Sequence, residues 1–361
     1  MEQKLADNQI KCSNCGAILT YEPGSETLKC PYCGTENQIE IEQVDTEELL
    51  AKIPYEPFIA NEDTTVLEEA KTVRCPTCGA ETTFEANVVS GKCPFCDTPL
   101  ILKDAINKKL VKPQIVVPFK ITRKEATKKF KDWLKSKWFA PAKAKKYSQI
   151  SEKMQGLYRP YWLFDTYTIT HYTGERGIEY ETTRTDSEGN TYTETEVRWT
   201  YVEGTITKQF TNYTMSASKT LEEVRDKIKI GWDYTQAQPF DERFLTGFKT
   251  ETYQISVKEA FEDAKSLIEF RLKEDVRRDI GGDRQRIHSM DVQFKDIGFL
   301  LALLPLWISA YRYKNKVYRF VVNGQTGEVS GQYPVSWGKV MLVVLLALIV
   351  IAALVYFFMQ S

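Results

Sequence analysis

The sequence predicts a multidomain chain with two small cysteine-rich modules, an α+β body and one C-terminal transmembrane helix. Three observations predict this order. All eight cysteines of the 361 residues lie before residue 97, in two sets with the same spacing. Helix and strand patterns alternate between residues 103 and 336, and the apolar run 340–359 contains no charged residue. A hydrophobic content of 42% suffices for folded cores, and the length allows two or three domains.

The apolar run from Val340 to Met359 predicts the membrane helix. At about 1.5 Å per residue, a helix of this length spans about 30 Å, the hydrocarbon thickness of a bilayer. A buried core helix and a β-rich, aggregation-prone tail are the alternatives, but twenty apolar residues at a chain end are expected to find no partner surface to cover them. Basic residues between Arg312 and Lys339 outnumber the single acid, Glu328, and predict that the N-terminal part is cytoplasmic. We therefore expect a single-pass cell-membrane protein with a C-terminal anchor.

The two cysteine sets form an internal repeat, because each reads C-x2-C-x14-C-x2-C and the second lies 63 residues after the first. Paired Cys-x-x-Cys turns bring four thiolates to one point, where Zn²⁺ binds them tetrahedrally at about 2.3 Å. Glycine follows three of the four pairs, as expected in tight turns, whereas Asp97 follows the fourth. The expected ligands of two zinc ions are Cys12, Cys15, Cys30, Cys33, Cys75, Cys78, Cys93 and Cys96.

These sites are expected to be structural, since four cysteines leave no open coordination position. Disulfides and redox dithiols are the alternatives. The N-terminus lacks the apolar core of a secretory signal, which predicts a reducing compartment, and no βαβ pattern surrounds a Cys-x-x-Cys pair. We assign zinc ribbon 1 to residues 1–40, an acidic linker to 41–70 and zinc ribbon 2 to 71–102.

A strongly basic stretch follows the second ribbon. Residues 103–146 carry fifteen Lys or Arg against three acids, whereas Gly34 to Ala70 carries eleven acids against Lys52 alone. A capping box of Thr122 and Glu125 predicts a helix from about Arg123 to Trp138. One of its faces is basic and could bind the phosphates of nucleic acid or anionic lipid, or remain a solvated face: Lys124, Lys128, Lys131 and Lys135.

Strand patterns begin after residue 154. Two runs, Ile178–Thr185 and Thr191–Val202, flank a turn at residues 187–190 and predict a hairpin with two polar faces. Such a hairpin could project and pair with a partner's strand edge. A meander covered on one face by its own domain is commoner, and it is the arrangement we expect.

The body is predicted to contain two diverged copies of one unit, with chance similarity as the alternative. Residues 121–126 and 255–260 match at Ile, Lys, Glu and Ala, and the Pro-Tyr-Trp of residues 160–162 is echoed by the Pro-Leu-Trp of 305–307. Each copy reads strand, helix, strand, strand: 103–247 with the basic helix and the hairpin, and 248–336. A capping box of Ser256 and Glu259 predicts the start of the second helix, which should end by Gly281-Gly282. This predicts an α+β body with helices on one face of an antiparallel sheet, in which Ile297–Ala310 is a buried strand.

No residue pattern indicates catalysis. His171 and His288 are the two histidines, and neither has a metal-ligand spacing. Phosphate-binding glycine loops, nucleophile elbows and paired-carboxylate signatures are absent from the sequence. We therefore expect a protein that is not an enzyme and has no small-molecule substrate.

The tandem knuckles, the PYWLFD strand, the segment LPLWISAYRYKNKVYRFVVNGQTGEVSG and the terminal span together resemble bacterial membrane proteins described as TFIIB-type zinc-ribbon-containing proteins. That resemblance implies association with phage-shock-protein-A-type and SPFH-type proteins of the envelope stress response. The expected function is therefore a membrane-anchored adaptor that recruits other proteins at the cytoplasmic face. The alternative is a membrane-tethered nucleic-acid binder that uses the ribbons and the basic residues 103–146, which is possible but not favoured.

Overall fold

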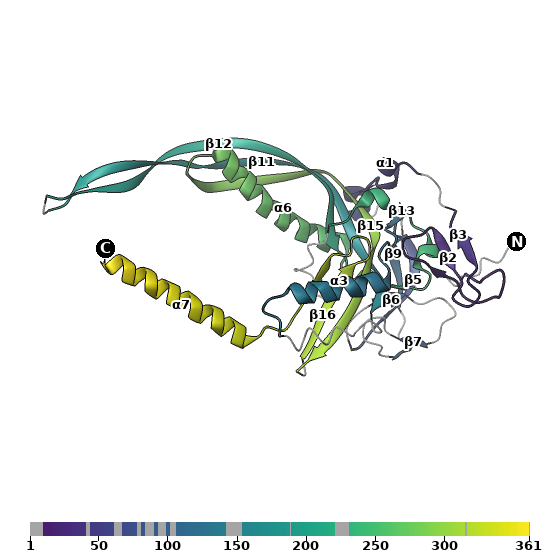
Figure 1. Ribbon diagram of the computed structural model, residues 1–361. Coiled ribbons are helices and arrows are strands. Elements are labelled where there is room, and N and C mark those ends of the chain that lie inside the picture. The colour runs from purple at the N-terminus through teal and green to yellow at the C-terminus, as the bar shows by residue number, and fades with distance from the viewer. Residues whose placement is uncertain are drawn as a thin grey trace.

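The computed structural model describes residues 10–40, 44–60, 67–77, 81–83, 90–92, 99–101, 106–141, 154–187, 189–220, 231–314 and 316–360. Within these residues an α+β body is built on a nine-stranded sheet, whose central path runs β12-β11-β15-β10-β13 (Figure 1). The strands of this sheet are β4 (Ile53–Pro54), β10 (Ile115–Val116), β11 (Gln155–Thr185), β12 (Thr191–Ser216), β13 (Gln238–Pro239), β14 (Lys249–Thr250), β15 (Arg284–Tyr313), β16 (Lys316–Asn323) and β17 (Val329–Gly331).

Three smaller sheets lie among the N-terminal residues. The region of the first cysteine set, called ribbon 1 below, contributes a three-stranded sheet, and the region of the second cysteine set contributes a three-stranded and a two-stranded sheet. Their strands are β1 (Thr20–Tyr21), β2 (Thr27–Lys29) and β3 (Glu36–Gln38); β5 (Leu67–Arg74), β6 (Glu81–Thr83) and β9 (Ile106–Val111); and β7 (Ser90–Lys92) with β8 (Pro99–Ile101).

The helices follow the sequence signals closely. Both predicted capping boxes are present, at Thr122 for α3 and at Ser256 for α6, and Gly281 ends α6 with a φ of +67°. The two helices begin as predicted, and α3 ends two residues before the predicted Trp138. The helices are α1 (Thr46–Leu49), α2 (Tyr55–Ile59), α3 (Arg123–Ser136), α6 (Val257–Ile280) and α7 (Trp337–Gln360), with 3-10 turns at η3 (Tyr234–Gln236) and η4 (Glu242–Leu245).

The helices α3 and α6 cover the same face of the central sheet. On β11, Tyr158 packs in the cluster that contains Phe130 of α3, and Trp162 packs in the cluster that contains Phe261 of α6. Because side chains of a strand alternate between faces, residues 158 and 162 point to the same side. The opposite face, which carries Leu163, is covered by residues around α1 and η3. Helices α3 and α6 therefore lie on one face, as the sequence predicts. The expectation of an antiparallel sheet is wrong, because β10 pairs in parallel with β15 and β14 pairs in parallel with β11.

The segment predicted as an acidic linker packs against the body over residues 44–60. The short strand β4 pairs with β15 through Pro54 and Ile53, and Tyr55 of α2 joins the core beside Phe261 and Phe299. The short helix α1 also lies in this segment. Four acids and two prolines interrupt the apolar positions of this segment, so no helix or strand period extends far enough to indicate these contacts.

The expectation that its own domain covers the hairpin over Ile178–Thr185 and Thr191–Val202 is wrong for most of that hairpin, because the covered part of β11 and β12 lies nearer the body. β11 and β15 pair as far as Gly177 with Arg284, and α6 lies beneath this part of the ribbon. Beyond it, β11 and β12 pair only with each other among the described residues, from Ile178 with Arg198 to the turn. Figure 1 shows this outer half extending far from the body. The hairpin therefore projects, because neither α6 nor β15 is long enough to cover it.

The last helix is apolar on every side. Among the described residues it is the one helix long and apolar enough to cross a membrane, over Trp337–Met359, with a mean hydropathy of 3.2 and no burial against the body. In Figure 1 it leaves the body and its C-terminal end lies far from the N-terminus. The predicted strand Ile297–Ala310 forms most of the C-terminal half of β15, and this half is mostly buried, as expected.

Candidate metal centre and interaction surfaces

Four cysteines of ribbon 1 come together in two tight turns, one before β1 and one between β2 and β3. In each turn a glycine with positive φ, Gly16 at +73° and Gly34 at +75°, donates its N–H to the carbonyl of the first cysteine. This folds each Cys-x-x-Cys pair so that both sulfurs face the other turn. The sequence predicted these turns from the same two glycines.

The sulfur geometry fits one metal ion. The Sγ atoms of Cys12 and Cys33 are 3.6 Å apart, those of Cys15 and Cys30 are 3.5 Å apart, and all four lie within 4.8 Å of one another. A disulfide needs about 2.05 Å, whereas four thiolates at about 2.3 Å from a tetrahedral ion lie about 3.8 Å apart. The predicted ligands Cys12, Cys15, Cys30 and Cys33 therefore form a cluster that could hold one metal ion.

The thiols of the cluster differ in pKa, and Cys33 ionises more easily than Cys15. The hydroxyl and the N–H of Thr35 lower the pKa of Cys33 to about 6. The N–H of Ala17 favours ionisation of Cys15, but hydrogen bonding with the Cys30 and Cys33 thiols opposes it and raises the pKa of Cys15 to about 12. Four crowded thiols cannot all ionise without a cation, which is the environment that a divalent metal requires.

Ribbon 1 is attached firmly to the body. The Tyr21 backbone N–H donates to the carbonyl of Thr246 at 3.0 Å, and the Gly24 N–H donates to that of Phe119 at 2.8 Å. The ring of Tyr21 packs edge-on against Phe244, with centroids 5.3 Å apart. The module that carries the cysteine cluster therefore shares its hydrophobic core with the sheet.

The second cysteine set is described only in part. Cys75 is buried directly after β5, whereas Cys78, Cys93 and Cys96 lie outside the described residues. The second metal site stays a prediction from the repeat.

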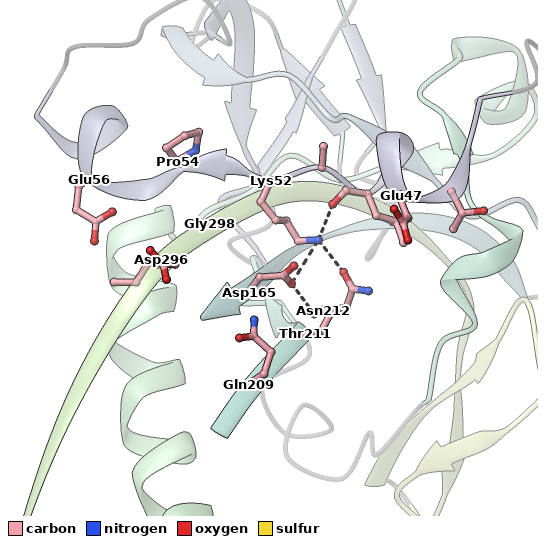
Figure 2. Close-up of a pocket in the computed structure, with 14 residues that line it drawn as sticks. Glu47, Lys52, Pro54, Glu56, Asp165, Gln209, Thr211, Asn212, Asp296 and Gly298 are labelled. Atoms are coloured by element: carbon pink, nitrogen blue, oxygen red, sulfur yellow. Dashed lines mark hydrogen bonds and ion pairs between the residues drawn. The ribbon is translucent and has the colours of Figure 1, made fainter. Parts of the chain in front are cut away.

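A polar pocket of about 760 Å³ lies where residues 44–60 cross the sheet (Figure 2). Both long strands that pair with β11 kink here, with positive φ at Asn212 and Asp296 and register shifts beside Asp165. Lys52 fills the kink: its Nζ lies 3.4 Å from Asp165 and donates to Asn212 Oδ1 and to the Leu50 carbonyl, both at 2.8 Å.

The ammonium group of Lys52 is thus fully engaged by the protein itself. Burial lowers the pKa of Lys52, and the Asp165 carboxylate opposes that shift. A pocket whose cation already has three acceptors offers little to an anionic ligand, so Lys52 holds the segment on the sheet. Sequence reasoning missed this role, although Lys52 is the only basic residue in its acidic block.

The two histidines lie on the long strands of the central sheet, His171 on β11 and His288 on β15. His171 hydrogen-bonds the Thr205 hydroxyl across the β11–β12 pair, and His288 lies 3.6 Å from Glu175. Both are exposed, and neither joins the cysteine cluster.

The sequence matches no protein-family model, and no solved structure matches the chain. It is similar to "Uncharacterized protein YdjG" of Bacillus subtilis (strain 168), with 28% identity over 333 residues that make up 91% of each chain. The name of that relative assigns no function, so the similarity indicates a shared architecture of similar length.

Proposed function

We propose that this chain is a membrane-anchored adaptor that binds other proteins at the cytoplasmic face of the membrane. The observation that carries the proposal is the projecting ribbon of β11 and β12 (Figure 1). Among the described residues, β12 pairs with β11 along one edge and with no strand along the other. A free edge presents N–H and C=O groups that a partner strand can pair with.

The outer half of the β11–β12 hairpin carries charged side chains that favour solubility when no partner is bound. Charged pairs lie on its surface, such as Arg184 with Glu194 at 3.1 Å, and the guanidinium of Arg198 lies over the ring of Tyr180. Charges on an edge strand discourage unspecific pairing. Tyr192 lies in this outer half and is 49% exposed, and Tyr201, which pairs with Glu175 just inside it, is 59% exposed; both supply aromatic contacts for a specific partner.

The membrane anchor in this proposal is α7, with the N-terminal part of the chain in the cytoplasm. Its support is the apolar surface of α7 and the basic residues that precede it. The same proposal includes two structural Zn²⁺ ions, one in each ribbon, since four thiolates suit zinc. Resemblance to the TFIIB-type zinc-ribbon membrane proteins favours partners of the phage-shock-protein-A and SPFH types.

The proposal also includes the duplication of a strand–helix–strand–strand unit. Two reciprocal hydrogen bonds support it. The indole of Trp162 in the first copy donates to the Ile255 carbonyl before α6, at 2.9 Å, and that of Trp307 in the second copy donates to the Ile121 carbonyl before α3, at 2.8 Å. Such an exchange is expected where two similar units pack around a pseudo-twofold axis.

Affinity purification of the full chain from solubilised membranes tests the adaptor function. In the test variant, residues 178–198 are replaced by an Asn-Gly turn, which removes the uncovered half of the hairpin and retains all pairing with β15. We expect specific partners to co-purify with the wild type and to be lost from this variant. A second variant, Tyr192→Ala with Tyr201→Ala, keeps the backbone edge and separates side-chain recognition from strand pairing. Equal recovery of the same proteins by the wild type and the shortened hairpin would refute the proposal.

A further inference from the structure

The loop after α3 is bound to the first turn of α7. The Nζ atom of Lys339 donates to the carbonyl of Trp138 at 2.6 Å and to that of Ala140 at 3.1 Å. The backbone N–H of Ser336 donates to the carbonyl of Phe139 at 2.9 Å. Two segments that lie 201 residues apart in the sequence are thus held together at the point where the apolar helix begins.

Large aromatic side chains are exposed at this point. Trp138 is 52% exposed and Trp337 is 78% exposed, although both lie beside the body. Amines lie beside the rings: Lys339 Nζ is 5.5 Å from the centroid of Trp138, and Lys137 Nζ is 4.9 Å from that of Trp133. Trp and Lys together are typical of the membrane–water boundary, where an indole meets the headgroups and an amine meets phosphate.

The depth of this cluster follows from the covalent chain. The apolar run begins at Val340, directly after Lys339, so a membrane-spanning α7 places Lys339 at the level of the headgroups. Its two hydrogen bonds place the backbone of Trp138 at the same depth. The one acid at this end of α3, Asp132, lies 3.7 Å from Lys135 and is partly neutralised by it.

We propose that Lys137, Trp138, Trp337 and Lys339 form a docking surface, the junction, for the anionic headgroup layer of the bilayer. The proposal rests on the proposed function, in which α7 spans the membrane. It adds that the loop after α3 lies at the membrane surface. In this arrangement α7 anchors the body, and the junction fixes the orientation of the body relative to the membrane. A single helix without such a contact would let the body rotate freely.

Fluorescence quenching by brominated lipid tests the junction in the full chain. The protein is reconstituted in phosphatidylcholine vesicles, with or without phosphatidylglycerol, that contain lipid brominated near the top of the acyl chains. We expect Trp138→Phe and Trp337→Phe each to remove a comparable share of the quenching. Trp232→Phe, on the opposite face of the sheet, is the matched control and should leave the quenched signal unchanged.

A charge variant tests the preference for anionic lipid. Lys137→Glu should reduce the quenching of Trp138 in vesicles with phosphatidylglycerol and have little effect in phosphatidylcholine alone. Lys273→Glu, on the exposed surface of α6, is the matched control and should change neither. An equal response of Lys137→Glu in both lipids would contradict electrostatic recognition.

Carbonate extraction separates failure of the junction from failure of the anchor. If the chain resists carbonate and Trp337→Phe lowers the quenching while Trp138→Phe does not, the junction is wrong and the anchor stands. If carbonate releases the chain and neither substitution matters, the anchor fails and the junction fails with it.

Discussion

A buried ion pair between Arg159 of β11 and Glu251, the residue after β14, allows a quantitative prediction. Arg159 and Glu251 have side chains that are 0% exposed, and Arg159 Nε lies 3.7 Å from Glu251 Oε2. The hydroxyls of Ser218 and Thr220 donate to Glu251 Oε1 at 2.6 and 2.5 Å. Arg159 in turn donates to the backbone carbonyls of both residues. The pair therefore connects β11, β14 and the end of β12.

Removing one charge leaves the other buried without compensation. Arg159→Met should destabilise the body by about 3–5 kcal/mol, the usual loss when one partner of a buried pair is removed. For a body of this size that is a fall in Tm of about 10 °C. The double variant Arg159→Met with Glu251→Gln should lose less than the sum of the two single variants, with a coupling of about 2 kcal/mol.

The pH dependence of the single variant follows from the sign of the Glu251 shift. Burial raises the pKa of Glu251, and the Arg159 guanidinium opposes that rise. Without Arg159 the folded pKa rises further, so the stabilising neutral form is present at low pH and is lost as pH rises through that pKa. The Tm deficit of Arg159→Met should therefore shrink between about pH 8 and about pH 5.

Thermal unfolding of the purified full chain in detergent, followed by tryptophan fluorescence, measures these effects. The double variant is the control for pH, because it lacks the titrating carboxyl and its deficit should stay constant. A deficit of about 1 kcal/mol or less for Arg159→Met, or strict additivity of the two single changes, would refute the assignment of a strongly coupled pair.

Three further predictions concern the metal ions, Trp162 with Trp307, and Lys52. Metal analysis of the purified chain should give two zinc ions, with one lost in Cys12→Ser/Cys15→Ser and the other in Cys75→Ser/Cys78→Ser; a single ion in the wild type would exclude the second site. Trp162→Phe and Trp307→Phe each remove an indole hydrogen bond and should each cost about 1–2 kcal/mol in thermal unfolding, with the larger loss at the fully buried Trp162. Lys52→Ala should release residues 44–60 from the sheet, seen as faster hydrogen exchange there, whereas exchange that stays as slow as in the wild type would show that β4 and Tyr55 hold the segment alone.

Local signals in the sequence predicted the parts of the fold that local chemistry determines. The capping boxes at Thr122 and Ser256 placed two helix starts, and Gly281 placed one helix end. The spacing of the first four cysteines and the glycines after each pair predicted the sulfur cluster. Each of these depends on residues a few positions apart, for which the sequence pattern is sufficient.

Contacts between distant segments could not be predicted in this way. Lys52 reaches Asn212 across 160 residues, and Lys339 reaches Trp138 across 201 residues. The projection of the hairpin depends on where β15 begins, at Arg284, relative to the length of β11. Alternation within the hairpin shows two polar faces but carries no information on where a third strand ends.

The helix α3 separates the metal centre from the membrane junction, and this separation allows their functions to be tested apart. Ribbon 1 contacts Phe119, just before α3, and α7 contacts Trp138, just after it. At about 1.5 Å per residue, the 14 residues of α3 place the two contacts about 20 Å apart.

Loss of metal from ribbon 1 should therefore disturb the surface around Tyr21 and leave the anchor intact. We expect Cys12→Ser/Cys15→Ser to remain in the carbonate-resistant membrane fraction while it loses those partners that contact ribbon 1. Lys339→Gln is the reciprocal test of the cysteine variant. It should keep both metal ions and lose the quenching of Trp138. If the cysteine variant were released from the membrane, the metal site and the anchor would depend on each other, and α3 would transmit the effect rather than separate the two sites.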